Sequence, residues 1–170
     1  MMRGSTKLLQ KSSIYLLPAI KIISNTEAPI WGIDANSYTL QNIGLLCDLG
    51  KRFREAYQDM SDTLLTKIML GVFGNVPAFD INFRRACKAE KISATFNCKV
   101  LGQIGAFYQR NQSEIDECKI PTFVFDNGIP NGLIYTKAKV IDMAFFAEGE
   151  KLLEADAKLK ADATQKMSNP

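Results

Sequence analysis

The sequence of 170 residues contains no histidine. This absence excludes the Ser-His-Asp and Cys-His arrangements that activate nucleophiles, and it excludes zinc sites with histidine ligands. Any acid–base step that needs an imidazole is excluded for the same reason. The side chains that remain for chemistry are those of aspartate, glutamate, lysine, cysteine and tyrosine.

Long hydrophobic runs are also missing. No stretch approaches the ~18–20 apolar residues of a membrane-spanning helix. The apolar run from Ile14 to Ile20 is interrupted by Pro18 and is followed by Lys21, which makes it marginal as the core of a signal peptide. We therefore expect a cytoplasmic protein without a membrane partner.

The four cysteines are Cys47, Cys87, Cys98 and Cys118, and no two of them form a Cys-x-x-Cys pair. This spacing speaks against a zinc ribbon and against a redox dithiol. In a chain of this length, widely spaced cysteines favour buried or incidental thiols in a reducing compartment over a disulfide framework. We expect neither a metal nor a cofactor.

The composition is that of a soluble globular protein, with 46% hydrophobic and 23% charged residues. The net charge of +3 (21 − 18) and the isoelectric point of about 8.6 are mild. Dedicated nucleic-acid-binding domains usually exceed an isoelectric point of about 9. Overall charge therefore does not establish a polyanionic partner, although a local basic face could bind one.

Apolar residues recur at three- and four-residue steps through most of the chain, as in helices with one buried face. The clearest helix is predicted over 38–58 with Ser37 as its N-cap, and Ser61, Asp80 and Asn97 are predicted caps of later helices. Residues 121–135 instead carry two Asn-Gly pairs between apolar segments, which predicts a small hairpin. The expected fold is therefore all-α, a compact helical bundle with one small β-hairpin near 121–135.

Three parts of the chain are expected. Residues 1–25 are predicted to form an N-terminal arm or helix, and residues 26–149 a helical core domain. Residues 150–170 are rich in lysine, glutamate, aspartate and alanine. This composition predicts a solvated helix and a flexible tail.

The most informative segment runs from Thr63 to Arg85, where a buried helix stops at glycines, turns through Val76-Pro77 and restarts at Asp80. It resembles the core of a group of uncharacterised bacterial proteins with the pattern TK-x-LxG-x-x-G-x-VPAYD-x-x-F. Phe79 stands where tyrosine is common in that group. The likeness extends loosely over residues 33–148, and it implies no assigned activity.

A more distant resemblance is to the helix-hairpin-helix DNA glycosylases. In that family a helix with a lysine leads through a proline-containing turn to an aspartate at the start of the next helix, and Lys67 and Asp80 occupy those places here. The resemblance implies that the lysine attacks a sugar carbon and forms a Schiff base, while the carboxylate stabilises the cationic transition state or activates water. The segment from Gln58 to Asp62 lacks the glycine-rich hairpin that grips DNA phosphate in that family.

A structural interpretation explains the same residues. Asp80 can cap a helix, and Lys67 can lie on the solvent-exposed face of its own helix. Asp142 lies in an apolar helical segment and needs a partner, for which Lys67, Arg84 and Tyr108 are candidates. Asp142 would then serve a structural ion pair or face a cleft. We keep Lys67, Asp80 and Asp142 as candidate catalytic residues beside this alternative.

Four basic residues, Arg84, Arg85, Lys88 and Lys91, lie within one predicted helix against a single acid, Glu90. They are the candidate nucleic-acid contacts, because a short positive ridge can hold phosphates. The same pattern also occurs on ordinary solvated helix faces.

Two classes of function remain. The first is a nucleic-acid-associated helical protein that binds DNA or RNA, either a glycosylase or lyase relative or a descendant that only binds. The second is a non-enzymatic module that docks another protein or a second copy of itself. The sequence does not decide whether the protein is an enzyme.

Overall fold

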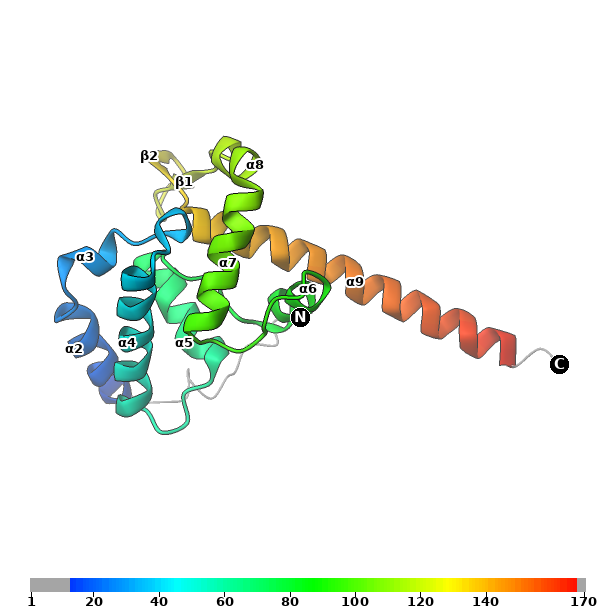
Figure 1. The fold of residues 1–170 in the computed structure, drawn as a ribbon, viewed down its shortest axis with the longest axis horizontal. Coiled ribbons are helices and arrows are strands. Elements are labelled where there is room, and N and C mark those ends of the chain that lie inside the picture. The colour runs from blue at the N-terminus through cyan, green and yellow to red at the C-terminus, as the bar shows by residue number, and fades with distance from the viewer. Residues whose placement is uncertain (1–12, 168–170) are drawn as a thin grey trace.

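The computed structural model describes residues 13–167. Figure 1 shows a helical body with a small hairpin beside the start of a long C-terminal helix, which runs outward from the body. The elements in chain order are η1 (Ser13–Leu16), α2 (Leu17–Ser24), α3 (Ala28–Trp31), η2 (Ala35–Ser37), α4 (Leu40–Ala56), α5 (Asp62–Ile68), η3 (Met69–Phe73), α6 (Ile81–Ala89), α7 (Cys98–Arg110), α8 (Gln112–Glu117), β1 (Pro121–Phe123), β2 (Pro130–Ile134) and α9 (Lys137–Met167). Among these elements, no helix has both the length and the apolar character needed to cross a lipid bilayer.

The predicted fold class is confirmed. The described chain is mainly helical, and β1 and β2 form a two-stranded antiparallel sheet in which Pro121 pairs with Ile134 and Phe123 with Pro130. Gly128 and Gly132 adopt positive φ angles of 65° and 80°. This left-handed backbone favours glycine and explains the two Asn-Gly pairs of the segment.

Helix starts follow the local capping chemistry. Ser61, Asp80 and Asn97 cap α5, α6 and α7 as predicted, because the side-chain oxygen of each accepts a backbone N–H three residues further on. The predicted cap of α4 is wrong by two residues. Thr39 accepts the N–H of residue 42, whereas the Ser37 hydroxyl closes the short turn η2.

The hydrophobic core lies between α4, α5, α6, α7 and the first half of α9. At its centre the ring of Phe83 lies 5.0 Å from the rings of both Phe79 and Phe145, centroid to centroid. Phe79 comes from the turn before α6 and Phe145 from α9. These ring contacts, tilted between Phe79 and Phe83 and stacked between Phe83 and Phe145, join the corner at residues 74–80 to the C-terminal helix.

The described part of the predicted N-terminal arm is attached to the body. The Tyr57 hydroxyl at the end of α4 donates a hydrogen bond to the carbonyl of Tyr15 and accepts one from the N–H of Ala19, at 2.8 and 3.0 Å. Ala19 is buried against α4. The rest of the predicted arm, residues 1–12, lies outside the described residues.

Packing along α9 changes at Gly149, which is buried against α6. A Cβ atom at this position would clash with the backbone oxygen of Asn82, so only glycine permits the two helices to approach this closely. Beyond Gly149 the described side chains of α9 are exposed, apart from the half-buried Leu152. The end of the predicted tail, residues 168–170, lies outside the described residues.

The expectation of four unpaired cysteines is wrong. Cys47 of α4 and Cys98 at the start of α7 form a disulfide, and their Cα atoms lie 6.0 Å apart. Cys87 is buried and Cys118 exposed, and both are free thiols. The sequence spacing did not reveal the pairing, because 51 positions separate two residues that only the packing of α4 on α7 brings together.

Candidate functional site

The turn between η3 and α6 forms the corner that the sequence singled out. The helix α5 continues as one turn of π-helix, η3, and ends at Gly74, whose φ of 68° lies in the left-handed region. A Cβ atom on Gly74 would lie 2.9 Å from the methyl carbon of Thr136. Glycine is therefore required here both for the backbone conformation and for the contact with the segment before α9.

Side chains from α5 and from the segment after η2 satisfy the backbone of this buried corner. The Thr66 hydroxyl accepts the N–H of Phe79 at 2.8 Å, and the Thr63 hydroxyl donates to the carbonyl of Phe79 at 2.8 Å. The Tyr38 hydroxyl donates to the carbonyl of Asn75 at 2.6 Å. A buried loop is tolerated only when its polar backbone groups find such partners. The corner is consequently a fixed part of the fold.

Asp142 of α9 contributes to the same corner. One carboxylate oxygen accepts the N–H of Ala78 at 2.9 Å, and the other receives the Lys139 ammonium at 2.7 Å. The predicted partners Lys67, Arg84 and Tyr108 are therefore wrong, since the cation comes from one turn earlier on the same helix. Asp142 has the structural role that was one of its two expected uses, although it also borders a pocket.

Asp34 fixes the start of α9. Its carboxylate accepts the N–H groups of Lys137 and Ala138 at 2.7 and 2.8 Å, more than a hundred positions along the chain.

Burial, and secondarily the negative charge of Asp34, raises the pKa of Tyr38 well above its ordinary value. The phenol therefore stays protonated and keeps its role as donor to the corner.

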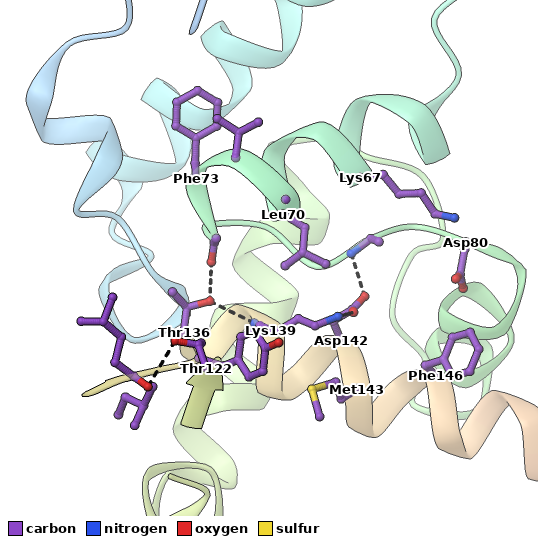
Figure 2. A pocket seen from close by; sticks show the side chains of 17 residues that line it. Lys67, Leu70, Phe73, Asp80, Thr122, Thr136, Lys139, Asp142, Met143 and Phe146 are labelled. Carbon is purple, nitrogen blue, oxygen red and sulfur yellow. Dashed lines mark hydrogen bonds and ion pairs between the residues drawn. The ribbon is translucent and has the colours of Figure 1, made fainter. Parts of the chain in front are cut away.

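A pocket of about 940 Å³ lies between the corner, the hairpin and the start of α9. Figure 2 shows side chains from these three segments around it. Its lining is mainly apolar, and the apolar side chains are those of Leu70, Val72, Phe73, Ala78, Leu133, Ile134, Tyr135, Met143 and Phe146. The volume falls within the range of small-molecule sites, about 300–1,000 Å³.

The three candidate catalytic residues all line this pocket. Figure 2 shows Lys67 and Asp80 at the same end of it, above Phe146. Lys67 is exposed and forms no hydrogen bond or ion pair with the residues whose side chains the structure describes, 14–159. Asp80 uses one carboxylate oxygen, Oδ1, to cap α6 through the N–H groups of Asn82 and Phe83 at 3.1 and 3.0 Å. Within the described residues, the pocket therefore has an unpaired amine and a carboxylate with its second oxygen open.

The predicted basic ridge is only partly exposed. Arg85 donates hydrogen bonds to the Asn82 side chain and to the Gly149 carbonyl, at 2.9 and 3.0 Å. Arg84 is half-buried and lies 3.8 Å from the Asp62 carboxylate. The two arginines of the ridge are thus engaged within the fold.

The other two predicted contacts, Lys88 and Lys91, are exposed. The helix α6 ends at Ala89, so Lys91 lies in the turn beyond it with a φ of 56° rather than on the helix as expected. Two exposed lysines thus remain of the four predicted phosphate contacts.

Several residues of the pocket were not anticipated. Leu133 and Ile134 come from the hairpin. The Thr136 hydroxyl donates a hydrogen bond to the Gly74 carbonyl at 2.6 Å. The Asn-Gly turns at 127–132 were the only sequence feature that bears on these residues. They predict a hairpin, but they do not predict which part of the helical body the hairpin packs against. Lys139 could have been found, because a position three residues from Asp142 lies on the same helical face.

No protein-family model, no curated protein and no solved structure matches this chain. The resemblances to the uncharacterised bacterial group and to the DNA glycosylases accordingly stay predictions. The geometry of the pocket is therefore the basis on which a function can be assigned.

Proposed function

We propose that the pocket is an active site for carbonyl chemistry at Lys67, with Asp80 as its acid–base partner. The observation that carries this proposal is a lysine amine, unpaired among the described residues, beside an aspartate at the end of a mainly apolar pocket. A lysine amine and a carboxylate suffice for imine formation, so the absence of histidine is no obstacle.

The step is a condensation. The lone pair of the Lys67 Nζ attacks the carbonyl carbon of the substrate, and the carbonyl π electrons move to oxygen. A proton passes from nitrogen to that oxygen, and Asp80, which lines the same pocket, relays it in the proposed mechanism. The hydroxyl group then receives the second proton of the nitrogen, again through Asp80, and leaves as water while the carbon–nitrogen double bond forms. No oxidant or reductant is consumed.

The lining indicates a mainly apolar carbonyl compound as the substrate. Leu70, Met143 and Phe146 offer hydrophobic contact, and Lys67 and Asp80 lie together at one end of the pocket. An abasic sugar of DNA is also a carbonyl compound, which keeps the lyase expectation within the same chemistry. It receives less support, because Arg84 and Arg85 contact the protein itself.

Reductive trapping tests the proposal. The full chain is incubated with an aromatic aldehyde and cyanoborohydride, and modified lysines are mapped by mass spectrometry. We expect Lys67 to be labelled before exposed lysines outside the pocket, such as Lys88. A parallel reaction with abasic DNA and borohydride tests the lyase form, in which a covalent adduct at Lys67 is the expected product.

The matched control is Lys67→Arg, which keeps the positive charge but does not form the adduct. Lys88→Arg serves as the control outside the pocket and is expected to leave the labelling of Lys67 unchanged. Labelling of Lys67 at the rate of Lys88 would contradict the proposal. An adduct with the aldehyde but not with DNA would contradict only the lyase form.

A second candidate function is a non-enzymatic protein-interaction module. It is favoured by the apolar side chains that the hairpin exposes, above all Phe125, which is fully exposed, and Ile129, which is 58% exposed. Apolar groups gathered on a small exposed element often mark an interaction surface. If Lys67 shows no enhanced labelling in the folded protein, this candidate becomes the better account of the pocket and the hairpin.

A further inference from the structure

The hairpin of β1 and β2 forms a wall of the pocket, yet it is held only at its base. Thr122, Leu133 and Ile134 line the pocket. Among the residues that the structure describes, no hydrogen bond or ion pair joins residues 121–134 to a segment outside 120–135. Figure 1 shows both strands at the margin of the helical body. Because a two-stranded hairpin without further support is only marginally stable in water, little in the fold fixes this wall in one position.

The base of the hairpin, in contrast, is anchored. The N–H of Tyr135 donates a 3.0 Å hydrogen bond to the carbonyl of Ile120, and Ile120 packs against the hydrophobic core. One residue further on, the Thr136 hydroxyl donates to the carbonyl of Gly74. These contacts leave the strands free to swing about their base while the other walls of the pocket stay in place.

We infer that the hairpin is a lid, which closes over the pocket when an apolar ligand occupies it. Leu133 and Ile134 line the pocket and are still 66% and 51% exposed, so both have apolar surface left to bury. A ligand between the hairpin and the apolar side chains of Leu70 and Phe146 removes this surface from water when the lid is closed. Because the ligand gains these contacts only in the closed state, it shifts the population toward that state.

The lid serves the chemistry at Lys67, and this role rests on the proposed function. Imine formation releases water and is reversed by water, so a pocket open to solvent favours the return of the free carbonyl compound. Closure of a lid excludes water from a site and holds the substrate in it. Closure itself requires an apolar ligand but no carbonyl group. The lid and the chemistry can therefore be tested separately.

The hairpin offers a test position and a matched control position. Leu133 lines the pocket, whereas the fully exposed Phe125 does not. Leu133→Ser removes an apolar side chain that closure would bury, and Phe125→Ser makes the same kind of change away from the pocket. Neither side chain belongs to the hydrophobic core, so both variants are expected to keep the native fold, which circular dichroism verifies.

Hydrogen exchange of the full chain, followed by mass spectrometry, measures the closure. The probes are benzaldehyde and benzyl alcohol, which are similar in size, but only the aldehyde can form an imine. The ring of Trp31, the single tryptophan, lies 4.5 Å from that of the pocket residue Phe73, so its fluorescence reports when a probe saturates the pocket. At saturation we expect the amides of residues 121–135 to exchange at least about threefold more slowly. The amides of α7, which does not line the pocket, should exchange at an unchanged rate.

Leu133→Ser should lose most of this protection at saturation, and Phe125→Ser should retain it. Unchanged exchange of residues 121–135 at saturation would overturn the inference, as would equal protection in the two variants or no response of Trp31 to either probe. Slower exchange with both probes, without preferential labelling of Lys67, would support the lid and contradict the proposed chemistry. Preferential labelling of Lys67 without slower exchange would support the chemistry and contradict the lid.

Discussion

The backbone N–H of Ala78 donates a 2.9 Å hydrogen bond to the carboxylate of Asp142, 64 positions further along the chain. Lys139 neutralises the same carboxylate at 2.7 Å. The buried corner between η3 and α6 is thereby tied to α9, and the wall of the pocket depends on this link.

Asp142→Ala is therefore expected to destabilise the fold by about 2–4 kcal/mol, since it leaves a buried N–H without a partner and Lys139 without its counter-ion. Asp142→Asn keeps an acceptor for Ala78 and should cost less. Urea unfolding measures both, and Asp156→Ala at an exposed position of α9 is the control. Equal stability of the alanine variant and the native protein would contradict the structural role.

The close approach of α9 to α6 at Gly149 gives a second prediction. Gly149→Ala places a Cβ atom against the Asn82 carbonyl oxygen with no room for it, so the helices must separate. We expect a loss of several kcal/mol in the free energy of unfolding, on the order of the larger values seen for overpacking. Thermal unfolding is the measurement.

Gly102→Ala in α7 is the matched control. The added Cβ atom meets nothing closer than Ile43, at 4.0 Å, and alanine is the better helix former by about 1 kcal/mol. A small gain in stability is expected. If both alanine variants changed the melting temperature in the same direction, the helix contact at Gly149 would be disproved.

The Cys47–Cys98 disulfide predicts a dependence of stability on reductant. Closing a loop of 51 positions restricts the unfolded chain and stabilises the fold by about 4 kcal/mol in the chain-entropy model. Reduction or Cys47→Ser should lower the melting temperature, whereas Cys118→Ser at an exposed thiol should not. Detection of four free thiols in the native oxidised protein would contradict the pairing.

The thiol of Cys87 should behave differently from that of Cys118. Burial raises the pKa of Cys87 to about 12, and the nearby Arg84 offsets only part of this effect. The stability associated with the neutral thiol is present below the ordinary pKa of 9 and is lost as the pH rises toward 12. At pH 9 we expect iodoacetamide to modify Cys118 rapidly and Cys87 only after unfolding. Equal rates in the folded protein would show that Cys87 is accessible.

The ion pair between Asp116 and Lys137 predicts a pH effect of the opposite sign. The hydrogen bond from Lys137, 3.0 Å away, lowers the pKa of Asp116. A lowered pKa contributes stability above the ordinary value of 3.8, and this contribution is lost as the pH falls below it. Asp116→Asn should therefore be less stable than the native protein at pH 7, and the difference should vanish near pH 2. A constant difference over this range would contradict the ionic role.

The sequence predicted those parts of the fold that local chemistry determines. The capping by Ser61, Asp80 and Asn97 needs only a side-chain oxygen near the first N–H groups of a helix, and each was anticipated. The hairpin followed from two Asn-Gly pairs. Lys67 and Asp80 were candidates because they occupy the places of the lysine and the aspartate in the helix-hairpin-helix DNA glycosylases that the segment resembles, and their catalytic role stays a prediction.

Features that depend on distant packing could not be predicted. The N–H of Ala78 that binds the Asp142 carboxylate lies 64 positions away and left no signal, whereas the cation Lys139, one helical turn away, could have been found. The inward contact of Arg85 depends on Gly149, which brings α9 against α6. Neither the disulfide nor the hairpin wall of the pocket leaves a local signal, since both arise when separate elements meet.

The central claim, that the pocket activates Lys67 with the help of Asp80, is tested most directly by the ratio of the labelling rates of Lys67 and Lys88 with an aromatic aldehyde and cyanoborohydride. We predict a ratio of at least about ten in the native protein. Asp80→Asn should bring the ratio close to one while preserving the fold, because asparagine also caps a helix. A ratio of one in the native protein, or a ratio unchanged by Asp80→Asn, would contradict the account.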